Sequence, residues 1–244
     1  MERIYKVSIV IPTLNEEVRL PILLKVLKNQ SYQNFEVIVS DAYSKDKTRE
    51  VAREFNTKIV DGGSISVGRN NGAKVAEGNI LIFMDADIYF NRDFLKDSLD
   101  EFTKKNYDVA ITKFDGKGVS AASRLLYKLS DIVKTITKNR KMKFGTSQCL
   151  FIKTEAFRLV NGFNENLLIG EDIDFMQRIS KARLKYGILN TKINASDRRF
   201  VKIGIFRVLV GSAMVVLMLS LGLYNRKKIQ KFVEKIYGGW GNLK

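Results

Sequence analysis

The stretch Ile80-Leu81-Ile82-Phe83-Met84-Asp85-Ala86-Asp87 decides the fold that is expected for this chain. Its five apolar residues are long enough for a buried strand and too short for a buried helix. The run ends in two carboxylates, and the alternation of side chains along an extended backbone places Asp85 and Asp87 on the same side. Because ligands of open α/β sheets bind outside the carboxyl ends of the strands, both acids are expected to face a ligand.

The Asp85–Asp87 pair has two interpretations. A hard divalent cation takes oxygen ligands and bridges carboxylates to substrate phosphates, so the pair suits Mg²⁺ or Mn²⁺. The alternative is a solvated turn at a strand end, which the triplet by itself favours. The choice depends on what the rest of the chain places beside these acids.

Apolar runs alternate with helical patterns before this stretch. Strands are expected at residues 6–11, 35–39 and 58–60, and helices at residues 19–29 and 47–55. Strands separated by helical patterns of roughly ten to fifteen residues predict βαβ units and a parallel sheet. We therefore expect an α/β fold with a doubly wound, mostly parallel sheet that has helices on both faces.

The composition removes several classes of chemistry. The chain has no histidine, so Ser-His-Asp triads, His-ligated zinc and imidazole bases are unavailable. No Gly-x-Gly-x-x-Gly follows the first strand and no Gly-x-x-x-x-Gly-Lys-Ser/Thr occurs, which argues against a dinucleotide cofactor and a P-loop. Proton transfer near neutral pH is therefore left to Asp, Glu, Lys, Tyr or the substrate.

Size, charge and cysteine content bound the organisation and the partners. The 244 residues fit one large domain or one domain with an appendage, and a net charge of +16 favours an anionic partner: nucleic acid, a membrane surface or a phosphorylated substrate. Cys149 is the one cysteine and fits a reducing compartment. The apolar run at residues 7–11 is too short for a signal-peptide core. We expect synthesis and retention in the cytosol.

Four segments, in order and in register, resemble the motifs of family 2 glycosyltransferases. They begin at Val10-Ile11-Pro12-Thr13, at Val39-Ser40-Asp41, at Gly68-Arg69-Asn70 and at Gly145, and the last contains Gly170-Glu171-Asp172. The resemblance covers residues 6–186. It implies the nucleotide-sugar-binding fold called GT-A. It also implies metal-dependent transfer, with inversion, of a sugar from a UDP- or GDP-sugar to a glycan or lipid acceptor.

The resemblance also gives roles to residues at the strand ends. The residues expected at the nucleotide-sugar donor are Pro12, Thr13, Glu16, Asp41, Arg69 and Asp85. Asp41 would accept hydrogen bonds from the base or ribose, and Arg69 would reach the pyrophosphate. Asp87 would be the metal ligand, with Asp85 near the ribose or a metal-bound water. The alternatives are a helix-capping role for Asp41 and an exposed helical position for Arg69.

Glu171 and Asp172 lie where a loop is expected to become a helix. In the family the second acid of this pair is the usual base, which is Asp172 here. A carboxylate opposite the metal can take the proton from an acceptor hydroxyl as that hydroxyl attacks the anomeric carbon. The alternative is that these acids and Asp174 complement the helix N-terminus. The absence of histidine favours the catalytic role.

Residues 119–143 are expected to form an amphipathic helix. Leu125, Leu129, Ile132 and Ile136 recur at helical spacing, and basic residues lie on the other face. The helix either packs on the core or lies on an anionic membrane.

The C-terminal segment has a similar character. The seventeen residues Val208–Tyr224 are uncharged and mostly apolar, at the lower limit for spanning a bilayer. Basic residues on both sides disfavour a single crossing and favour an interfacial or re-entrant helix, followed by an amphipathic stripe from Ile229 to Trp240. We divide the chain into a catalytic domain at 1–195 and a membrane-associating segment at 196–244, at the cytoplasmic face of the membrane. Packing on the catalytic domain or on a second subunit is the alternative.

Two other functions compete. A nucleotidyltransferase acting on sugar phosphates would also use acids at strand ends, but it leaves Glu171-Asp172 unexplained. A non-catalytic nucleic-acid binder would fit the net charge, but the basic residues flank apolar stretches instead of lining an aromatic groove. The expected partners are therefore a nucleotide-sugar, a glycan or lipid-linked acceptor and an anionic membrane surface, without nucleic acid.

Overall fold

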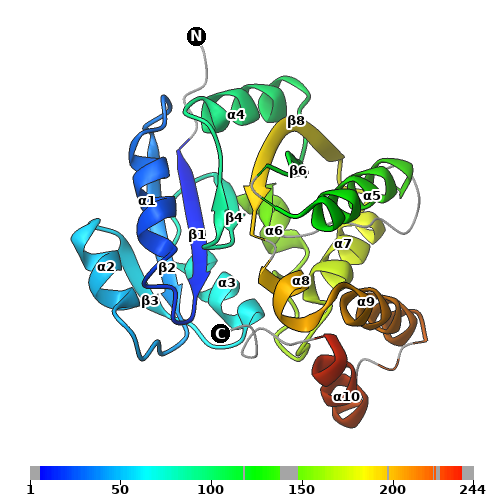
Figure 1. Ribbon diagram of the computed structural model, residues 1–244. Helices are drawn as coiled ribbons and strands as arrows, with labels where there is room; N and C mark the ends of the chain where they lie inside the picture. Colours follow the sequence, from blue (N-terminus) through cyan, green and yellow to red (C-terminus); the bar gives the residue numbers. More distant parts are fainter. Residues whose placement is uncertain are drawn as a thin grey trace.

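The computed structural model describes residues 6–117, 119–137, 148–196, 198–221, 223 and 226–237. Within these residues the strands are β1 (Val7–Thr13), β2 (Phe35–Asp41), β3 (Lys58–Asp61), β4 (Ile80–Met84), β5 (Ile88–Tyr89), β6 (Val109–Phe114), β7 (Cys149–Lys153) and β8 (Tyr186–Ala195). They form one sheet in the order β3-β2-β1-β4-β7-β6-β8-β5 (Figure 1).

The sheet is mixed but mostly parallel, as predicted. β3, β2, β1 and β4 pair in parallel, and β8 pairs in parallel with β6. β7 runs antiparallel between β4 and β6, and the short β5 runs antiparallel to β8. The carboxyl ends of β1, β2, β4 and β6 therefore lie at the same edge of the sheet.

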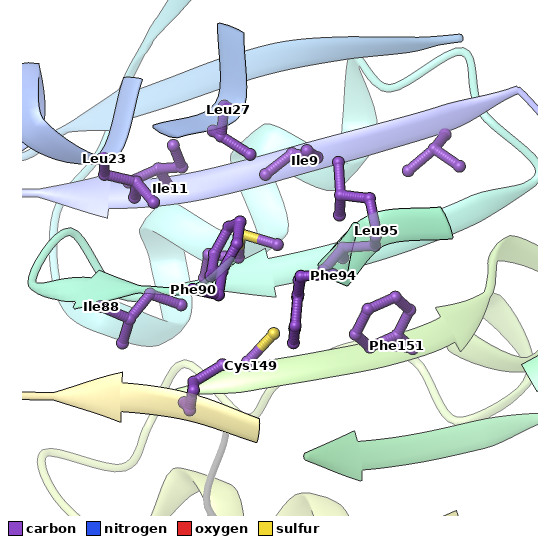
Figure 2. Packing of buried hydrophobic residues seen from close by; sticks show 14 of the residues in the cluster. Ile9, Ile11, Leu23, Leu27, Ile88, Phe90, Phe94, Leu95, Cys149 and Phe151 are labelled. Carbon is purple, nitrogen blue, oxygen red and sulfur yellow. The ribbon is translucent and has the colours of Figure 1, made fainter. Parts of the chain in front are cut away.

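The helices cover both faces of this sheet. They are α1 (Leu20–Lys28), α2 (Thr48–Glu54), α3 (Ile65–Lys74), α4 (Phe94–Lys104), α5 (Ala121–Thr137), α6 (Thr154–Leu159), α7 (Glu171–Lys181), α8 (Arg198–Ile203), α9 (Ile205–Ser220) and α10 (Lys227–Tyr237). One core cluster joins the sheet to α1, α2 and α4, and a second joins it to α3, α6 and α7. Figure 2 shows the first cluster, where α1 and α4 meet β1.

The central strand β4 is buried on both faces, which explains its unbroken apolar run. Ile80, Ile82 and Met84 belong to the first core cluster, whereas Leu81 and Phe83 belong to the second. The polar residues that follow Met84 are therefore the first in this segment that can reach the sheet edge.

Helix α3 packs unusually close to β1. A side-chain carbon at Gly72 would lie 2.3 Å from a methyl carbon of Val10, so only glycine fits. Ser64 caps this helix, since its hydroxyl accepts a hydrogen bond from the backbone amide of Val67. The close packing turns the Arg69 side chain, one turn before Gly72, toward the sheet edge.

The C-terminal helices rest on the segment that leads into α7. Val215 and Met218 of α9 and Val233 of α10 form a third apolar cluster with Ile169. Gln230 of α10 extends this contact, because its side chain accepts a hydrogen bond from the amide of Leu168 and donates one to the carbonyl of Asn166. One face of α9 is thus covered by protein.

The opposite face of α9 is exposed. Phe206 is 78% exposed, the exposed Leu209 and Leu217 follow it along the helix, and the exposed Leu221 comes directly after the helix end. Among the described helices, none is long and apolar enough to cross a membrane. Tyr224 and Trp240 of the expected apolar segments lie outside the described residues. The division of the chain at residue 195 stays a prediction.

Helix α5 does not bury the apolar stripe that the sequence shows. Leu125, Leu129, Ile132, Val133 and Ile136 are between 45% and 59% exposed. Tyr127 and Lys134 lie on the buried side instead. The helix therefore packs on the core, which was one of the two expectations, but through Tyr127 and not through the apolar stripe. Residues 138–143 lie outside the described part of the chain.

Candidate active site

Arg69 joins two of the predicted acids. Its guanidinium lies 3.2 Å from a carboxylate oxygen of Asp85 and 3.1 Å from one of Glu171. The residue is 1% exposed, and its guanidinium lies over the ring of Phe163 at 5.0 Å. The alternative of an exposed helical arginine is therefore wrong. Arg69 fixes the end of β4 to the start of α7.

Asp87 is paired with a second arginine, Arg198. A guanidinium nitrogen of Arg198 lies 3.6 Å from an oxygen of Asp87 and 3.0 Å from an oxygen of Glu16. Burial, and after it the neighbouring charge of Asp85, raise the pKa of Asp87 to about 6, although Arg198 opposes both. A carboxylate whose charge is this poorly compensated is suited to a cation.

The sequence reasoning missed Arg198 as a site residue. By its position in the sequence, Arg198 is one of the basic residues that precede the apolar run Val208–Tyr224. The structure instead holds it at the start of α8, with the side chain 18% exposed. β8 ends just before α8 and pairs through Ala195 with Ile88, the residue after Asp87. Local sequence patterns do not predict pairing between strands so far apart in the chain. The contact of Arg198 with Asp87 therefore could not be predicted from the sequence.

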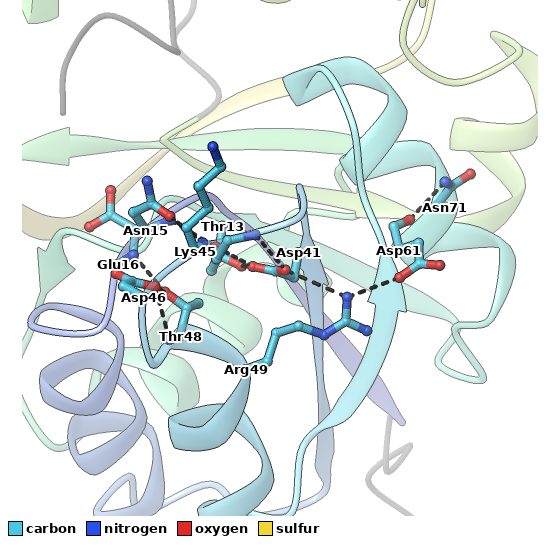
Figure 3. Close-up of polar contacts among 11 residues, drawn as sticks. Thr13, Asn15, Glu16, Asp41, Lys45, Asp46, Thr48, Arg49, Asp61 and Asn71 are labelled. Atoms are coloured by element: carbon cyan, nitrogen blue, oxygen red, sulfur yellow. Dashed lines mark hydrogen bonds and ion pairs between the residues drawn. The ribbon is translucent and has the colours of Figure 1, made fainter.

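Thr13 and Asp41 end two neighbouring strands and face each other across them (Figure 3). Both are fully buried, and the Thr13 hydroxyl donates a hydrogen bond of 3.2 Å to the Asp41 carboxylate. Asp41 also accepts a bond of 3.0 Å from the amide of Ser44, and Arg49 lies 3.7 Å from it. Asp41 therefore organises the turn after β2, and a role toward a nucleotide stays a prediction.

Glu16 ties the loop after β1 to the start of α2 (Figure 3). Its backbone amide donates a 2.7 Å hydrogen bond to the Thr48 hydroxyl, and the amide of Thr48 donates to Asp46. Pro12, the second-last residue of β1, pairs in register with Ser40. The loop that ends at Glu16 is therefore held by the polar turn that begins at Asp41, while the Glu16 carboxylate reaches Arg198.

The acids of α7 occupy its first turn, after Gly170 in the left-handed conformation with φ 77°. Glu171 is bound by Arg69, and Asp174 is bound by Arg178 at 2.8 Å. Asp172 lies between them, half-buried, and accepts a hydrogen bond from the next backbone amide. This contact fits a helix start, but it occupies one carboxylate oxygen and leaves the catalytic prediction for Asp172 standing.

The residues at the end of β4 fit a metal bound jointly with substrate. The described residues contain no cluster of three or more His, Cys, Asp or Glu side chains suited to holding an ion. Asp85 and Asp87 alone offer two carboxylates whose charges repel. Mg²⁺ in particular is commonly held by one or two carboxylates plus substrate phosphates, so the donor set fits such a cation.

The amino-acid sequence identifies the family. The model described as Glycosyl transferase family 2 matches residues 8–160, more than half of the chain. The chain belongs to glycosyltransferase family 2. The matched residues include Thr13, Asp41, Arg69 and the Asp85–Asp87 pair, whereas the acids of α7 and Arg198 lie beyond them.

Relatives of the family agree with this assignment. The 4,4'-diaponeurosporenoate glycosyltransferase of Staphylococcus haemolyticus is 37% identical over 116 residues, which cover 43% of this chain and 31% of the relative. The chain spans less than a third of the length of the first curated relatives that it matches.

Solved structures of glycosyltransferases share the fold. TarS residues 1–349 from S. aureus, in complex with UDP-GlcNAc, superposes with a TM-score of 0.65 at 21% identity, covering 95% of this chain and 70% of that one. The mannosyltransferase PcManGT from Pyrobaculum calidifontis, in complex with GDP-Man and Mn²⁺, gives 0.66 at 16% identity, covering 85% and 61%. The GT-A-type fold is therefore confirmed.

Proposed function

We propose that this protein transfers a sugar, with inversion, from a UDP- or GDP-sugar to a glycan or lipid-linked acceptor, using Mg²⁺ or Mn²⁺. One observation carries the proposal: the buried guanidinium of Arg69 holds Asp85 and Glu171 together. Through this contact the acids expected at the donor and the acids expected at the acceptor share one site. The alternative, a nucleotidyltransferase, does not explain why Glu171 is joined to Asp85.

The donor class is supported by the similar proteins. TarS is described in complex with UDP-GlcNAc, and PcManGT in complex with GDP-Man and Mn²⁺. In this chain Asp87, with Asp85 beside it, would hold the cation. When bound, the cation would neutralise the charge that develops on the leaving nucleoside diphosphate.

The chain's own residues would perform the remaining steps. Asp172 would accept the proton of the acceptor hydroxyl as its oxygen attacks the anomeric carbon. Glu171, already bound to Arg69, would hold the start of α7 in place and so orient Asp172. Thr13 and Asp41 would set the floor of the nucleotide subsite, because both end at the same sheet edge as β4.

We also infer that the C-terminal helices attach the protein to the cytoplasmic face of a membrane. The exposed apolar side chains of α9 and the exposed lysines of α10 support this inference. Apolar side chains would enter the interface, and each lysine near an anionic surface would contribute about 1 kcal/mol. Flotation with anionic vesicles and with neutral vesicles tests it, since the charge contribution predicts stronger binding to the former.

A panel of nucleotide-sugars tests the proposed activity. Release of nucleoside diphosphate is measured with UDP- and GDP-sugars, with Mn²⁺ or with excess chelator. We expect release from one donor class, its loss with chelator, and the same loss in Asp87→Ala. Exposed Asp93, at the start of α4, offers the control Asp93→Ala. Metal-independent release in the wild type, or full activity of Asp87→Ala, would refute the metal site.

A further inference from the structure

A basic cleft lies between α5 and the ends of β6 and β8. Its volume is about 470 Å³, which is within the range of small-molecule sites. Four cationic side chains line it, from Lys113, Arg124, Lys128 and Lys192. No residue of this cleft belongs to the site described above.

The two acids in the cleft are already paired. Asp131 accepts hydrogen bonds from Lys134, at 2.9 Å, and from the amide of Phe114, at 3.0 Å. Asp115 lies 3.1 Å from the ammonium of Lys117 and 4.0 Å from that of Lys192. Within the described residues, neither Arg124 nor Lys128 forms an ion pair. The cleft therefore has uncompensated positive charge and favours an anion.

The exposed apolar stripe of α5 begins at this cleft. Ile132 lines the cleft and also belongs to the stripe. The rotation of α5 that exposes the stripe is fixed by specific contacts. The Tyr127 ring stacks on Phe114 at 4.4 Å, and its hydroxyl donates to the carbonyl of Ser196. Lys134 is buried over the same Phe114 ring at 4.0 Å. These contacts turn the apolar side chains outward.

The cleft also adjoins the metal-binding strand end. The loop that follows β6 is bound at Lys117, whose carbonyl accepts a hydrogen bond from the hydroxyl of Tyr89 at 3.2 Å. Tyr89 follows Asp87 by two residues. The amide of Lys117 donates a hydrogen bond to the side chain of Asn194, which pairs with Tyr89 between β5 and β8. A molecule in the cleft would therefore lie beside the loop that contacts the segment following Asp87.

We propose that this cleft binds the phosphate group of a lipid-linked acceptor whose hydrocarbon chain lies along the exposed stripe of α5. The proposal rests on the proposed function and names its acceptor class. The positive charge of the cleft favours a phosphate group, and the adjoining apolar stripe of α5 favours a hydrocarbon chain attached to that phosphate. A free phosphate would leave the stripe uncovered, and an uncharged lipid would leave Arg124 and Lys128 without an anionic partner.

Three probes separate the two parts of this ligand. Farnesyl phosphate has both a phosphate and an apolar chain, farnesol has only the chain, and inorganic phosphate has only the charge. Binding to the full chain is measured by calorimetry, at concentrations where the lipids are monomeric so that vesicle attachment does not contribute. We expect farnesyl phosphate to bind at least about tenfold more tightly than either of the others.

Matched variants locate the binding. Lys128→Ala with Lys192→Ala should weaken farnesyl phosphate binding by about ten- to thirtyfold and leave farnesol binding unchanged. The control, Lys96→Ala with Lys104→Ala on α4, removes the same charge from exposed positions outside the cleft.

A second pair tests the stripe. Leu129→Asn with Val133→Asn should weaken binding of both lipids and spare inorganic phosphate, whereas Ile22→Asn, at an exposed apolar position on α1, should not. Circular dichroism verifies that each variant is folded.

Three outcomes would overturn the proposal: equal affinity for inorganic phosphate and farnesyl phosphate, cleft variants that bind like the wild type, or equal losses in the cleft and control variants. Binding of UDP is measured on the same samples. Normal UDP binding with unaffected cleft variants refutes the cleft alone. A wild type that fails to bind UDP or GDP, but shows the expected lipid pattern, refutes the proposed donor and leaves the cleft standing.

Discussion

Two arginines from distant parts of the chain each hold one acid of the Asp85–Asp87 pair. Arg69 of α3 holds Asp85 and also reaches Glu171, and Arg198 of α8 holds Asp87 and also reaches Glu16. They differ in burial, because Arg69 is 1% exposed and the Arg198 side chain is 18% exposed.

This difference in burial suggests different roles: Arg69 is a fixed part of the site, whereas Arg198 is free to exchange Asp87 for a substrate group. Arg69 is enclosed by two carboxylates and by the Phe163 ring, so it positions both acids without a bound substrate. The contact between Arg198 and Asp87 is long, at 3.6 Å, and the pKa of Asp87 is raised to about 6 although the charge of Arg198 lowers it. A substrate phosphate could compete for Arg198 but could reach Arg69 only after displacing a carboxylate.

The largest expected effect is on the rate of sugar transfer and concerns Asp172, which follows the Arg69-bound Glu171 in α7. Asp172→Asn keeps the shape of the side chain and removes its basicity, so sugar transfer should fall by roughly two to four orders of magnitude while UDP or GDP binding persists. Glu171→Gln serves as the comparison, since we assign that residue to positioning. Single-turnover transfer and calorimetry measure the two quantities. A larger rate loss in Glu171→Gln would exchange the two roles.

The next largest effect is on stability and comes from removing the buried guanidinium of Arg69. Arg69→Leu leaves Asp85 and Glu171 without their shared cation, which should lower the free energy of unfolding by about 3–5 kcal/mol. Urea unfolding measures it, with Arg53→Leu at an exposed position of α2 as control. A loss below about 1 kcal/mol would mean that the two acids find other partners.

The raised pKa of Asp87 gives the next effect. Between the unfolded pKa near 4 and the folded pKa of about 6, the folded state binds the additional proton. Stability therefore falls as the pH rises through this window, by up to about 3 kcal/mol from this group. In metal-free protein, Asp87→Asn should remove this decline. Urea unfolding from pH 4 to pH 8 tests it, and an unchanged pH profile would contradict the assigned pKa.

Arg198→Leu should have the smallest effect on folding, because the pair is partly solvated. We expect a loss of about 1–2 kcal/mol, between the ranges for surface and buried pairs. The same change should move the pH-dependent decline to higher pH, since Arg198 lowers the pKa of Asp87. A stability loss equal to that of Arg69→Leu would remove the distinction between the two arginines.

Contiguous features of the site were predictable from sequence. The buried strand Ile80–Met84 and the acids after it form one unbroken pattern, and the end of β1 and the start of α2 follow from similar local signals. The burial of Arg69 was not predictable, because it depends on the approach of α3 to Val10 and on Phe163. Arg198 depends on the pairing of β5 with β8.

Amphipathic helices show the same limit. Leu20, Leu23, Leu24 and Leu27 of α1 form a stripe that the sheet buries, whereas the comparable stripe of α5 is exposed. Periodicity identifies an apolar face but not what covers it. In α5 the contacts of Tyr127 and Lys134 with Phe114 decide the rotation, and these are tertiary contacts.

The packing of α9 and α10 on Ile169 and Ile173 sets the distance between the acids of α7 and any surface to which the tail attaches. Ile173 directly follows Asp172, so these acids and their support move together. An enzyme on a flexible tether samples acceptors throughout a volume set by the tether's length. A tail seated on the start of α7 would instead work like a ruler, selecting acceptor groups that project a fixed distance from the lipid.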